Sequence, residues 1–352
     1  MIFVKEEPLY LDKNENAYGP SPKCSFVLRR ASMRLFNSYP REAVHKLRQR
    51  LSEKFQVDES RIMLGYGSED ILKQALYYGL LPRKRKILLP KQSWWYYRGL
   101  ADELDAEVGY YEIKEEETQY TVDLNEILKR VKESQAKVVI LCSPNNPTGD
   151  NWKVSYLEKF LENNPNCLVI LDQAYWGFVP EDNSYLQNFV ERFPRLVIIR
   201  SFSKYYALAG IRIGFAFIGD HFKLVKRFNE RYLGYNRLSE EMALAAISSE
   251  NYYQQVAKRI LKNNRQMINE FRKIDGVKAY ASAANFVFLK ILRAELLEAL
   301  QNVFEKQTII VKFLLKDPWE NNLRITTGTE RQTNRLLRVV KQTAQKLGLY
   351  NG

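Results

Sequence analysis

The sequence has few of the residues on which several common kinds of active site depend. Its 352 residues include three cysteines and two histidines. Cys24, Cys142 and Cys167 form no close pair, which argues against a disulfide framework and against a thiolate zinc site. With only His45 and His221 available, a Ser-His-Asp triad and a multi-histidine metal site are disfavoured as well. An enzyme built from this chain must therefore find its acid, base or nucleophile among other residue types.

Long apolar runs are also missing. Runs such as Val138 to Cys142 stop far short of the ~18 residues that span a bilayer, and the start, Met1-Ile-Phe-Val-Lys5, lacks the layout of a secretory signal. We therefore expect a cytoplasmic protein with no membrane partner. With 45% apolar residues, the length favours about two domains of ~150 residues each.

Positive charge, in contrast, is abundant. The 54 lysines and arginines outnumber the 41 aspartates and glutamates, which leaves a net charge of +13. Such an excess suits nucleic acid, an acidic membrane or anionic small substrates, and alone it does not choose among them. No zinc-finger spacing, basic zipper or aromatic RNA-binding signature accompanies it, so we expect no nucleic-acid partner. Short basic clusters, such as residues 83–86, are typical of solvated loops.

The middle of the chain alternates β-branched runs with amphipathic stretches, which predicts βαβ units and a mostly parallel sheet. Strands are expected at 137–142, 168–172 and 196–200, with helices at 154–161 and 186–193 between them. Continuous apolar runs are typical of strands that are covered on both faces. Because ligands of open α/β sheets bind beyond the carboxyl ends of the strands, chemistry is expected where these three strands end.

Polar residues follow all three strands. Ser143-Pro-Asn-Asn-Pro-Thr-Gly149 follows the first, Asp172-Gln-Ala-Tyr175 the second and Ser201-Phe-Ser-Lys204 the third. Each feature alone has an ordinary explanation, namely a helix cap, a turn and a solvated lysine. Their placement at successive strand ends is much harder to attribute to chance. We therefore expect a carboxylate, an amide, a phenol, hydroxyls and one amine to converge at one edge of the sheet.

An earlier strand pattern runs through Gly65-Tyr-Gly67 into a helix whose N-cap is expected to be Ser68. The free N–H groups and the dipole at such a helix start suit a phosphate. The segment is not a dinucleotide fingerprint, since Asp70 replaces the third glycine, and it is not a P-loop, since no Gly-Lys-Ser/Thr follows. By itself, the glycine pair is weak evidence and also fits a plain tight turn.

Aromatic residues, Ser93-Trp-Trp-Tyr-Tyr97, follow a further strand pattern at 86–90. Such runs usually pack in a core, but one ring could stack on a planar ligand. Together these features describe a site for a flat, phosphorylated, nitrogen-containing ring that is held by an amine. Pyridoxal phosphate fits, because its aldehyde needs a lysine, its ring nitrogen a carboxylate, its ring an aromatic neighbour, and its phosphate backbone amides and a cation such as Arg212.

At this point the sequence resembles the fold-type-I aminotransferases and, among them, the histidinol-phosphate aminotransferase group. The resemblance runs nearly end to end, and it rests on Leu11-Asp-Lys-Asn-Glu-Asn-Ala-Tyr-Gly-Pro20, Asn37-Ser-Tyr-Pro-Arg41, Gly65-Tyr-Gly-Ser-Glu69, Pro144-Asn-Asn-Pro-Thr-Gly149, Asp172-Gln-Ala-Tyr175, the Lys204 segment to Arg212 and Leu323-Arg-Ile-Thr-Thr-Gly328. The lysine segment with its downstream arginine is highly specific, whereas the glycine turn is not.

The resemblance implies an α/β fold of two parts. A large domain, residues 35–250, has a mostly parallel sheet flanked by helices and binds the cofactor. A smaller α+β domain joins both ends of the chain, 1–34 and 251–352. The C-terminal pattern agrees, since it predicts helices at 254–271, 294–304 and 330–347 and strands at 285–290, 308–313 and 323–327.

The resemblance also implies a role for particular residues. Lys204 would be the Schiff-base lysine and proton carrier, Asp172 the partner of the ring nitrogen and Tyr175, with Asn146, a donor to the ring hydroxyl oxygen. The remaining cofactor contacts would come from stacking by Trp94, from phosphate binding by Gly67, Ser68, Glu69, Ser201, Ser203 and Arg212, and from Tyr39 reaching into the neighbouring subunit. Arg324, Tyr18 and Lys312 would bind the substrate.

The implied enzyme is a homodimer that exchanges an amino group between a small amino donor, histidinol phosphate foremost, and 2-oxoglutarate. Some positions depart from the family pattern: Ala17 replaces a proline, Gln173 a glutamate, Gly177 an acidic residue and Lys312 an arginine that faces the substrate phosphate. Lysine lacks the bidentate fork of arginine, so phosphate selectivity stays open. Two alternatives also remain, a threonine-phosphate decarboxylase and a non-catalytic regulator with the same fold.

Overall fold

The computed structural model describes residues 7–38, 46–81, 85–180, 182–229 and 235–350. The α-helices in these ranges are α1 (Pro22–Arg30), α2 (Arg34–Asn37), α3 (Lys46–Phe55), α4 (Gly67–Leu80), α5 (Tyr96–Glu103), α6 (Leu124–Ser134), α7 (Val154–Asn163), α8 (Tyr185–Arg192), α9 (Lys223–Asn229), α10 (Arg237–Ile247), α11 (Glu250–Phe271), α12 (Ala294–Lys306) and α13 (Glu330–Lys346). Short 3-10 helices lie at η1 (Glu59–Arg61), η2 (Ala209–Ile211) and η3 (Asp220–Phe222).

The strands are β1 (Leu9–Leu11), β2 (Ile62–Gly65), β3 (Lys86–Pro90), β4 (Glu107–Tyr111), β5 (Ile113–Glu115), β6 (Tyr120–Val122), β7 (Val138–Cys142), β8 (Leu168–Asp172), β9 (Leu196–Ser201), β10 (Gly214–Ile218), β11 (Val277–Tyr280), β12 (Phe286–Ile291), β13 (Ile309–Leu314) and β14 (Asn322–Thr326). The predicted strands and helices of the middle and C-terminal regions are thus confirmed, with ends that differ by a few residues at most.

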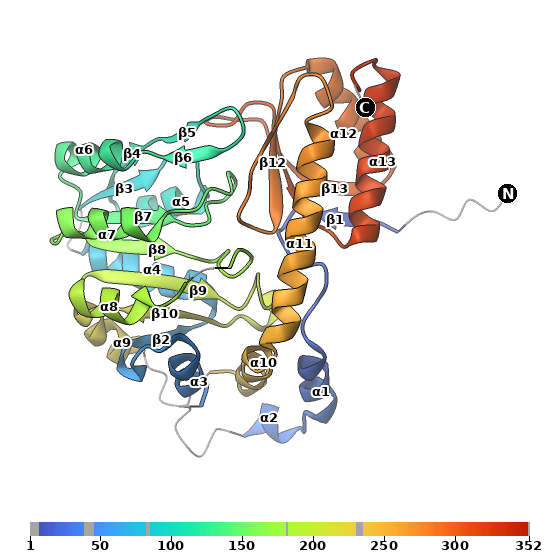
Figure 1. The fold of residues 1–352 in the computed structure, drawn as a ribbon. Helices are drawn as coiled ribbons and strands as arrows, with labels where there is room; N and C mark the ends of the chain where they lie inside the picture. Colours follow the sequence, from blue (N-terminus) through green and yellow to red (C-terminus); the bar gives the residue numbers. More distant parts are fainter. Residues whose placement is uncertain (1–6, 39–45, 82–84, 181, 230–234, 351–352) are drawn as a thin grey trace.

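The large sheet has seven strands in the order β2-β10-β9-β8-β7-β3-β4 (Figure 1). Only β10 runs antiparallel to its neighbours, so the prediction of a mostly parallel sheet is confirmed. Every residue of β7, β8 and β9 is buried. Their side chains alternate between two hydrophobic clusters, with Val138 and Ile140 in one and Val139 and Leu141 in the other. This is why the runs are apolar without interruption, since helices cover both faces.

A second sheet has five strands in the order β1-β13-β14-β12-β11. The N-terminal strand β1 pairs in parallel with β13, with Leu9 opposite Ile309, so the two ends of the chain meet here. Helix α11, the long orange helix in Figure 1, contributes to both cores: Tyr253 packs with the large-sheet cluster and Phe271 with the small-sheet cluster. The predicted domain limits, 35–250 against 1–34 with 251–352, stay a prediction.

Within the described ranges, no helix is both long enough and apolar enough to cross a membrane.

Candidate active site

The register of the large sheet brings the predicted strand ends to one edge. Cys142 at the end of β7 lies opposite Asp172 at the end of β8. On the other side of β9, Gly214 pairs with both Ser201 and Gly65. The loops that carry the predicted chemistry therefore start side by side, as expected for the carboxyl edge of an α/β sheet.

Asp172 is a buried carboxylate with two hydrogen-bond donors. The hydroxyl of Tyr97 donates to its Oδ2 at 2.8 Å, and the backbone N–H of Ala174 donates to its Oδ1 at 2.9 Å. Burial nevertheless raises the pKa of Asp172, because these two hydrogen bonds only partly offset the loss of hydration. A cation placed against this carboxylate would lower the pKa again, and a protonated pyridine nitrogen is such a cation.

The side-chain amine of Lys204 loses its proton more readily than that of an exposed lysine. Burial, together with the positive charges of Arg324 and Arg212, lowers the pKa of Lys204 to about 8. Its Nζ donates to the backbone oxygen of Lys13 at 2.8 Å and lies 5.7 Å from the centre of the Tyr175 ring. Above about pH 8 most of these amines are neutral, which is the form that attacks an aldehyde or accepts a proton.

The start of α4 and Arg212 form a cradle whose groups suit a phosphate. Gly67 has a φ of +80°, and a Cβ there would lie 2.8 Å from Nη2 of Arg212. A Cβ on Gly214 would lie 2.5 Å from the backbone nitrogen of Ser68. Side chains at either glycine would thus fill the space between the helix start and the arginine, so both glycines keep the backbone N–H groups open to an anion.

The predicted N-cap of this helix was wrong. Helix α4 begins at Gly67 and its N-cap is Tyr66, which caps with no side chain, while Ser68 lies in the first turn. The physical reason is that the left-handed Gly67 starts the helix two residues earlier than predicted, and Asp70 accepts the backbone N–H of Tyr66 at 2.9 Å in place of a serine cap. The prediction of backbone phosphate ligands does not depend on the identity of the cap.

The other predicted phosphate ligands lie around this cradle. Ser201 and Ser203 are buried, and the N–H of Ser203 donates to Oγ of Ser201 at 3.0 Å. Glu69 directs its carboxylate to Arg212 at 3.8 Å and to Lys73 at 3.2 Å. Glu69 therefore orients the arginine, and only its backbone is suited to a phosphate.

A cavity of about 730 Å³ brings the predicted stacking and substrate residues together. Trp94, Asn146, Lys312 and Arg324 all line it. Arg324 donates from Nη1 to Oδ1 of Asn146 and from Nη2 to the backbone oxygen of Asp12, both at 2.5 Å. Its Nε has no hydrogen-bond partner among the residues described here, and burial lowers its pKa. This arginine is therefore held in place with donor capacity to spare for an anionic ligand.

Two residues that the sequence interpretation left out join the site. Tyr97 touches Asp172 as described above, and it also packs edge-on against Trp94, with ring centres 5.6 Å apart. Asn14 donates from Nδ2 to the hydroxyl of Tyr175 at 2.8 Å. The run of four aromatic residues was a signal for Tyr97, although it indicated a stacking ring rather than a hydrogen bond. For Asn14 no signal beyond its place in a family segment was present.

Lys204, Asp172, Tyr175 and the predicted phosphate ligands do not line this cavity, although Tyr97, which lines it, donates to Asp172. Two further predicted site residues are not joined to it. Tyr39 lies outside the described residues. Tyr18 receives a hydrogen bond from Nδ2 of Asn263 at 3.3 Å and has Arg259 5.9 Å above its ring, and it is not one of the residues lining the cavity. The contact of Tyr18 with substrate stays a prediction.

Two departures from the family pattern have a structural explanation. Gly177 has a φ of +100°, and a Cβ there would lie 2.8 Å from the ring of Tyr205, so no acidic side chain fits. Gln173 accepts a hydrogen bond at 2.8 Å from Nε of the fully buried Arg200, which lies over the ring of Trp176. Gln173 thus acts in packing behind the site.

The loop after β7 ends on a buried acid, Asp150, which provides a pH test. Burial raises the pKa of Asp150 to about 6. The pKa of Asp150 is higher in the folded chain than in the unfolded chain, where it is about 4. The protonated carboxyl therefore stabilises the fold below about pH 4, and this stabilisation is lost as the pH rises through 6. The asparagine of an Asp150→Asn variant cannot titrate in this way. Relative to the wild type, the free energy of unfolding of Asp150→Asn should therefore be about 2 kcal/mol more favourable at pH 7.5 than at pH 4. Urea unfolding at both pH values measures this shift, and parallel curves would contradict it.

The residues fit a pyridoxal phosphate. A buried carboxylate that needs a cation, an amine with a pKa of about 8, a glycine-lined cradle beside Arg212 and an aromatic wall occur at one sheet edge. The fold and the site together define a pyridoxal-phosphate-dependent enzyme of fold type I. The role of each residue toward the cofactor stays a prediction.

Comparison with known proteins identifies the family. The sequence pattern of the family described as aminotransferase class I and II matches residues 6–340. A histidinol-phosphate aminotransferase of Hydrogenovibrio crunogenus is 32% identical over 343 residues, which cover 94% of this chain and 90% of that protein. The chain therefore belongs to the class I and II aminotransferases and is a pyridoxal-phosphate-dependent aminotransferase, as the resemblance implied.

Solved structures share the fold at lower identity. A histidinol-phosphate aminotransferase from Sinorhizobium meliloti, in complex with pyridoxal 5'-phosphate, superposes with a TM-score of 0.86 at 21% identity, covering 97% of this chain and 91% of that one. An L-threonine-O-3-phosphate decarboxylase from Porphyromonas gingivalis gives a TM-score of 0.80 at 20% identity, covering 96% and 99%. These likenesses confirm the predicted fold class.

Proposed function

We propose that this aminotransferase moves an amino group between histidinol phosphate and 2-oxoglutarate. The observation that carries the proposal is the pair of cations in the cavity, Lys312 and Arg324, which face each other as register partners of β13 and β14. Both proposed substrates are small anions, one with a phosphate and one with two carboxylates. Two cations at one site can receive either anion in turn, and the similarity to histidinol-phosphate aminotransferases points to these substrates.

The two cations differ in what they can recognise. Arg324 is held by Asn146 and by the Asp12 backbone, so its planar group has a fixed orientation suited to a carboxylate or phosphate edge. Lys312 is exposed on its strand and presents a single mobile charge. We infer that Arg324 aligns the anionic end of each substrate and that Lys312 adds affinity for the more highly charged one.

Bound pyridoxal phosphate supplies an aldehyde that links to an amine and a ring that takes up electrons when a proton leaves the substrate Cα. The chain would hold it with Asp172 at the ring nitrogen, Trp94 against the ring face and Asn146 with Tyr175 at the ring hydroxyl. Gly67, Ser68, Glu69, Ser201, Ser203 and Arg212 would hold the phosphate. Lys204, once free, would carry the proton, since burial already makes its neutral form accessible near pH 8.

We further propose a cytoplasmic homodimer in which each subunit supplies Tyr39 to the neighbouring cofactor. The support is the resemblance to the family alone, because Tyr39 lies outside the described residues. Equilibrium sedimentation of the holoenzyme should give twice the chain mass. Mixing a Tyr39→Phe chain with a Lys204→Ala chain should restore part of the activity if the sites are shared.

A half-reaction screen tests the substrate. The holoenzyme is mixed with histidinol phosphate, an aromatic amino acid, threonine phosphate or glutamate, and conversion of the cofactor to its amine form is followed by absorbance. Histidinol phosphate and glutamate should react fastest. Release of carbon dioxide from threonine phosphate would favour the decarboxylase alternative, and retention of duplex DNA at physiological salt would favour a regulator.

Variants at the two cations sharpen this screen. Lys312→Gln should raise the KM for histidinol phosphate about tenfold, since one charge-assisted contact contributes roughly 1.5 kcal/mol, and should change that for an aromatic amino acid little. The matched control is Lys306→Gln, an exposed lysine near the start of the same strand but outside the cavity. If Lys312→Gln changed the KM for both substrates equally, Lys312 would not recognise the phosphate.

Tyr97 offers a milder prediction about the same centre. In Tyr97→Phe, Asp172 loses one of its two hydrogen-bond donors while the ring packing is kept. Because a hydrogen bond to a charged group contributes about 1.5–3 kcal/mol, kcat should fall by roughly tenfold or more. A positioning role also predicts that the pH at which the bound cofactor changes its absorbance will move, which a packing defect would not cause. An unchanged pH profile with reduced kcat would contradict this role.

A further inference from the structure

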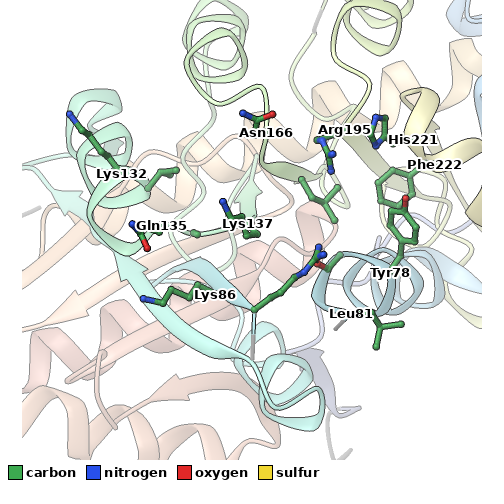
Figure 2. Close-up of a pocket in the computed structure, with 15 residues that line it drawn as sticks. Tyr78, Leu81, Lys86, Lys132, Gln135, Lys137, Asn166, Arg195, His221 and Phe222 are labelled. Atoms are coloured by element: carbon green, nitrogen blue, oxygen red, sulfur yellow. The ribbon is translucent and has the colours of Figure 1, made fainter. Parts of the chain in front are cut away.

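A second large cavity, whose lining residues Figure 2 shows, is formed at the edge where the parallel strands of the large sheet begin. Its volume is about 1090 Å³, and residues at the starts of β3 and β8, just before β7 and β9, and near the ends of α4 and α6 line it. Lys137 lines this cavity directly before β7, whereas Cys142 ends that strand at the active-site edge. Five residues of strand span about 17 Å, so the two sites are separate.

One wall of this cavity is strongly positive. The described residues that line the cavity include Arg85, Lys86, Lys132, Lys137 and Arg195, and no aspartate or glutamate is among them. Like charges gathered around a concave surface repel one another, and their field is focused into the cavity. The cluster therefore costs stability in the free protein, and an anion that enters the cavity would offset that cost.

Three of these cations have ordinary structural roles. Lys86 forms an ion pair with Glu107 at 3.3 Å. Arg85 donates to the backbone oxygen of Gly79 at 3.1 Å, and Lys132 lies in the last turn of α6, where a positive charge complements the helix dipole. These roles explain why positive residues occur at this edge of the sheet.

Lys137 and Arg195 are not explained in this way. Neither forms an ion pair or side-chain hydrogen bond that can be identified with any residue in the described ranges. Both lie near the buried thiol of Cys167. Burial raises the pKa of this thiol, and the positive charges of Lys137 and Arg195 partly oppose that rise. They therefore lie near each other, and Figure 2 shows them around the hollow together with Lys86 and Asn166. Two neighbouring cations with no other charged partner in the described ranges can bind the oxygens of phosphate groups.

The other wall of the cavity is apolar and aromatic. Tyr78 lines this wall and is 38% exposed overall, and the buried ring of Phe222 packs edge-on against it, with ring centres 5.2 Å apart. Leu81 and Leu168 extend this surface. A supported aromatic ring beside a cationic seat suits a ligand that has a flat ring at one end and phosphates at the other.

We propose that this cavity binds a nucleotide, with its phosphates against Lys137 and Arg195 and its base against Tyr78. The cavity volume of about 1090 Å³ lies just above the usual range of small-molecule sites, about 300–1,000 Å³, and so leaves room for a nucleoside with a phosphate chain. The site is independent of the cofactor and of the aminotransferase substrates, and it goes beyond the proposed function.

The test uses the holoenzyme, in which the phosphate cradle at Gly67 is occupied by the cofactor. Isothermal titration with ATP should show saturable binding of one molecule per chain. Tripolyphosphate should bind more weakly, because it lacks the base, and adenosine should bind very weakly, because it lacks the phosphates. Saturating 2-oxoglutarate should not displace ATP, since it occupies the cavity with Arg324.

Variants separate the two ends of the site. Lys137→Gln with Arg195→Gln should weaken ATP at least tenfold, and Tyr78→Ala should weaken ATP but leave tripolyphosphate unchanged. Lys262→Gln with Arg265→Gln is the matched control, because these two exposed residues of α11 remove the same charge away from the cavity. This control should bind ATP within twofold of the wild type.

Several results would overturn the proposal. These are the absence of saturable ATP binding, equal ATP affinity in the Lys137→Gln/Arg195→Gln variant, and displacement of ATP by 2-oxoglutarate. If tripolyphosphate bound as tightly as ATP, the base would contribute nothing to binding, and the proposed contact with Tyr78 would be excluded. Binding of a duplex oligonucleotide without binding of ATP would show that the surface serves nucleic acid instead.

Discussion

Lys204→Ala is expected to abolish transamination and to remove the visible absorbance of the lysine-bound cofactor. Lys204 lies at the active-site edge and burial contributes most to lowering its pKa to about 8, so it combines the right place with an accessible neutral form. The loss of a general base costs about 10²–10⁴-fold in rate, and the loss of the covalent anchor adds to this. We therefore expect kcat to fall by at least about 10⁴-fold.

The measurement combines absorbance spectra with single-turnover assays. Noncovalent binding of pyridoxal phosphate should persist in Lys204→Ala, because the phosphate cradle and Asp172 are unchanged, and it can be followed by dialysis. Lys258→Ala, an exposed lysine of α11, is a control for general loss of charge. Unchanged colour and activity in Lys204→Ala would refute the assignment of this lysine.

Asp172→Asn is expected to cause the second largest loss. The carboxylate faces the position proposed for the ring nitrogen, and asparagine keeps its size and its hydrogen bond from Ala174 but not its charge. A charge-stabilising group in a dry site is worth about 10²–10³-fold in kcat. We expect a decrease of this size, with cofactor still bound.

The stability of the cofactor-free protein provides the control for this variant. Burial raises the pKa of Asp172, so the ionised carboxylate destabilises the folded chain. This destabilisation grows as the pH rises above the pKa of Asp172 in the unfolded chain. Cofactor-free Asp172→Asn should therefore unfold at higher urea concentration than the wild type at pH 8, and the difference should shrink toward pH 4. Lower stability combined with lost activity would indicate a folding defect, and full activity would exclude the proposed role.

Much of the fold could be predicted from local pattern. The strands at 138–142, 168–172 and 196–201 are continuous apolar runs because helices cover both faces of the sheet, and such runs are visible in one dimension. The helices of the C-terminal part have equally clear periodicity. The position of chemistry at strand ends followed from a general rule of α/β sheets, and the family resemblance then assigned the residues.

The parts that could not be predicted depend on contacts between distant segments. Tyr97 and Asp172 are 75 positions apart, and only the packing of α5 against the sheet brings the phenol to the carboxylate. Asn14 reaches Tyr175 across 161 positions because β1 joins the C-terminal sheet. The N-cap of α4 was missed for a local reason, since the choice between Tyr66 and Ser68 depends on the backbone dihedral of Gly67.

The sequence by itself determined the fold class and the cofactor and predicted the lysine, because hydrophobic period and short motifs extend over a few residues and can be recognised without coordinates. Only the tertiary structure decided which polar groups meet. It joined Arg324 to Asn146, placed Tyr97 on Asp172 and gathered Lys137, Arg195 and Tyr78 around one cavity. The physical reason is that hydrogen bonds and focused charge depend on distances of a few ångströms, and chain folding sets those distances between segments far apart in sequence.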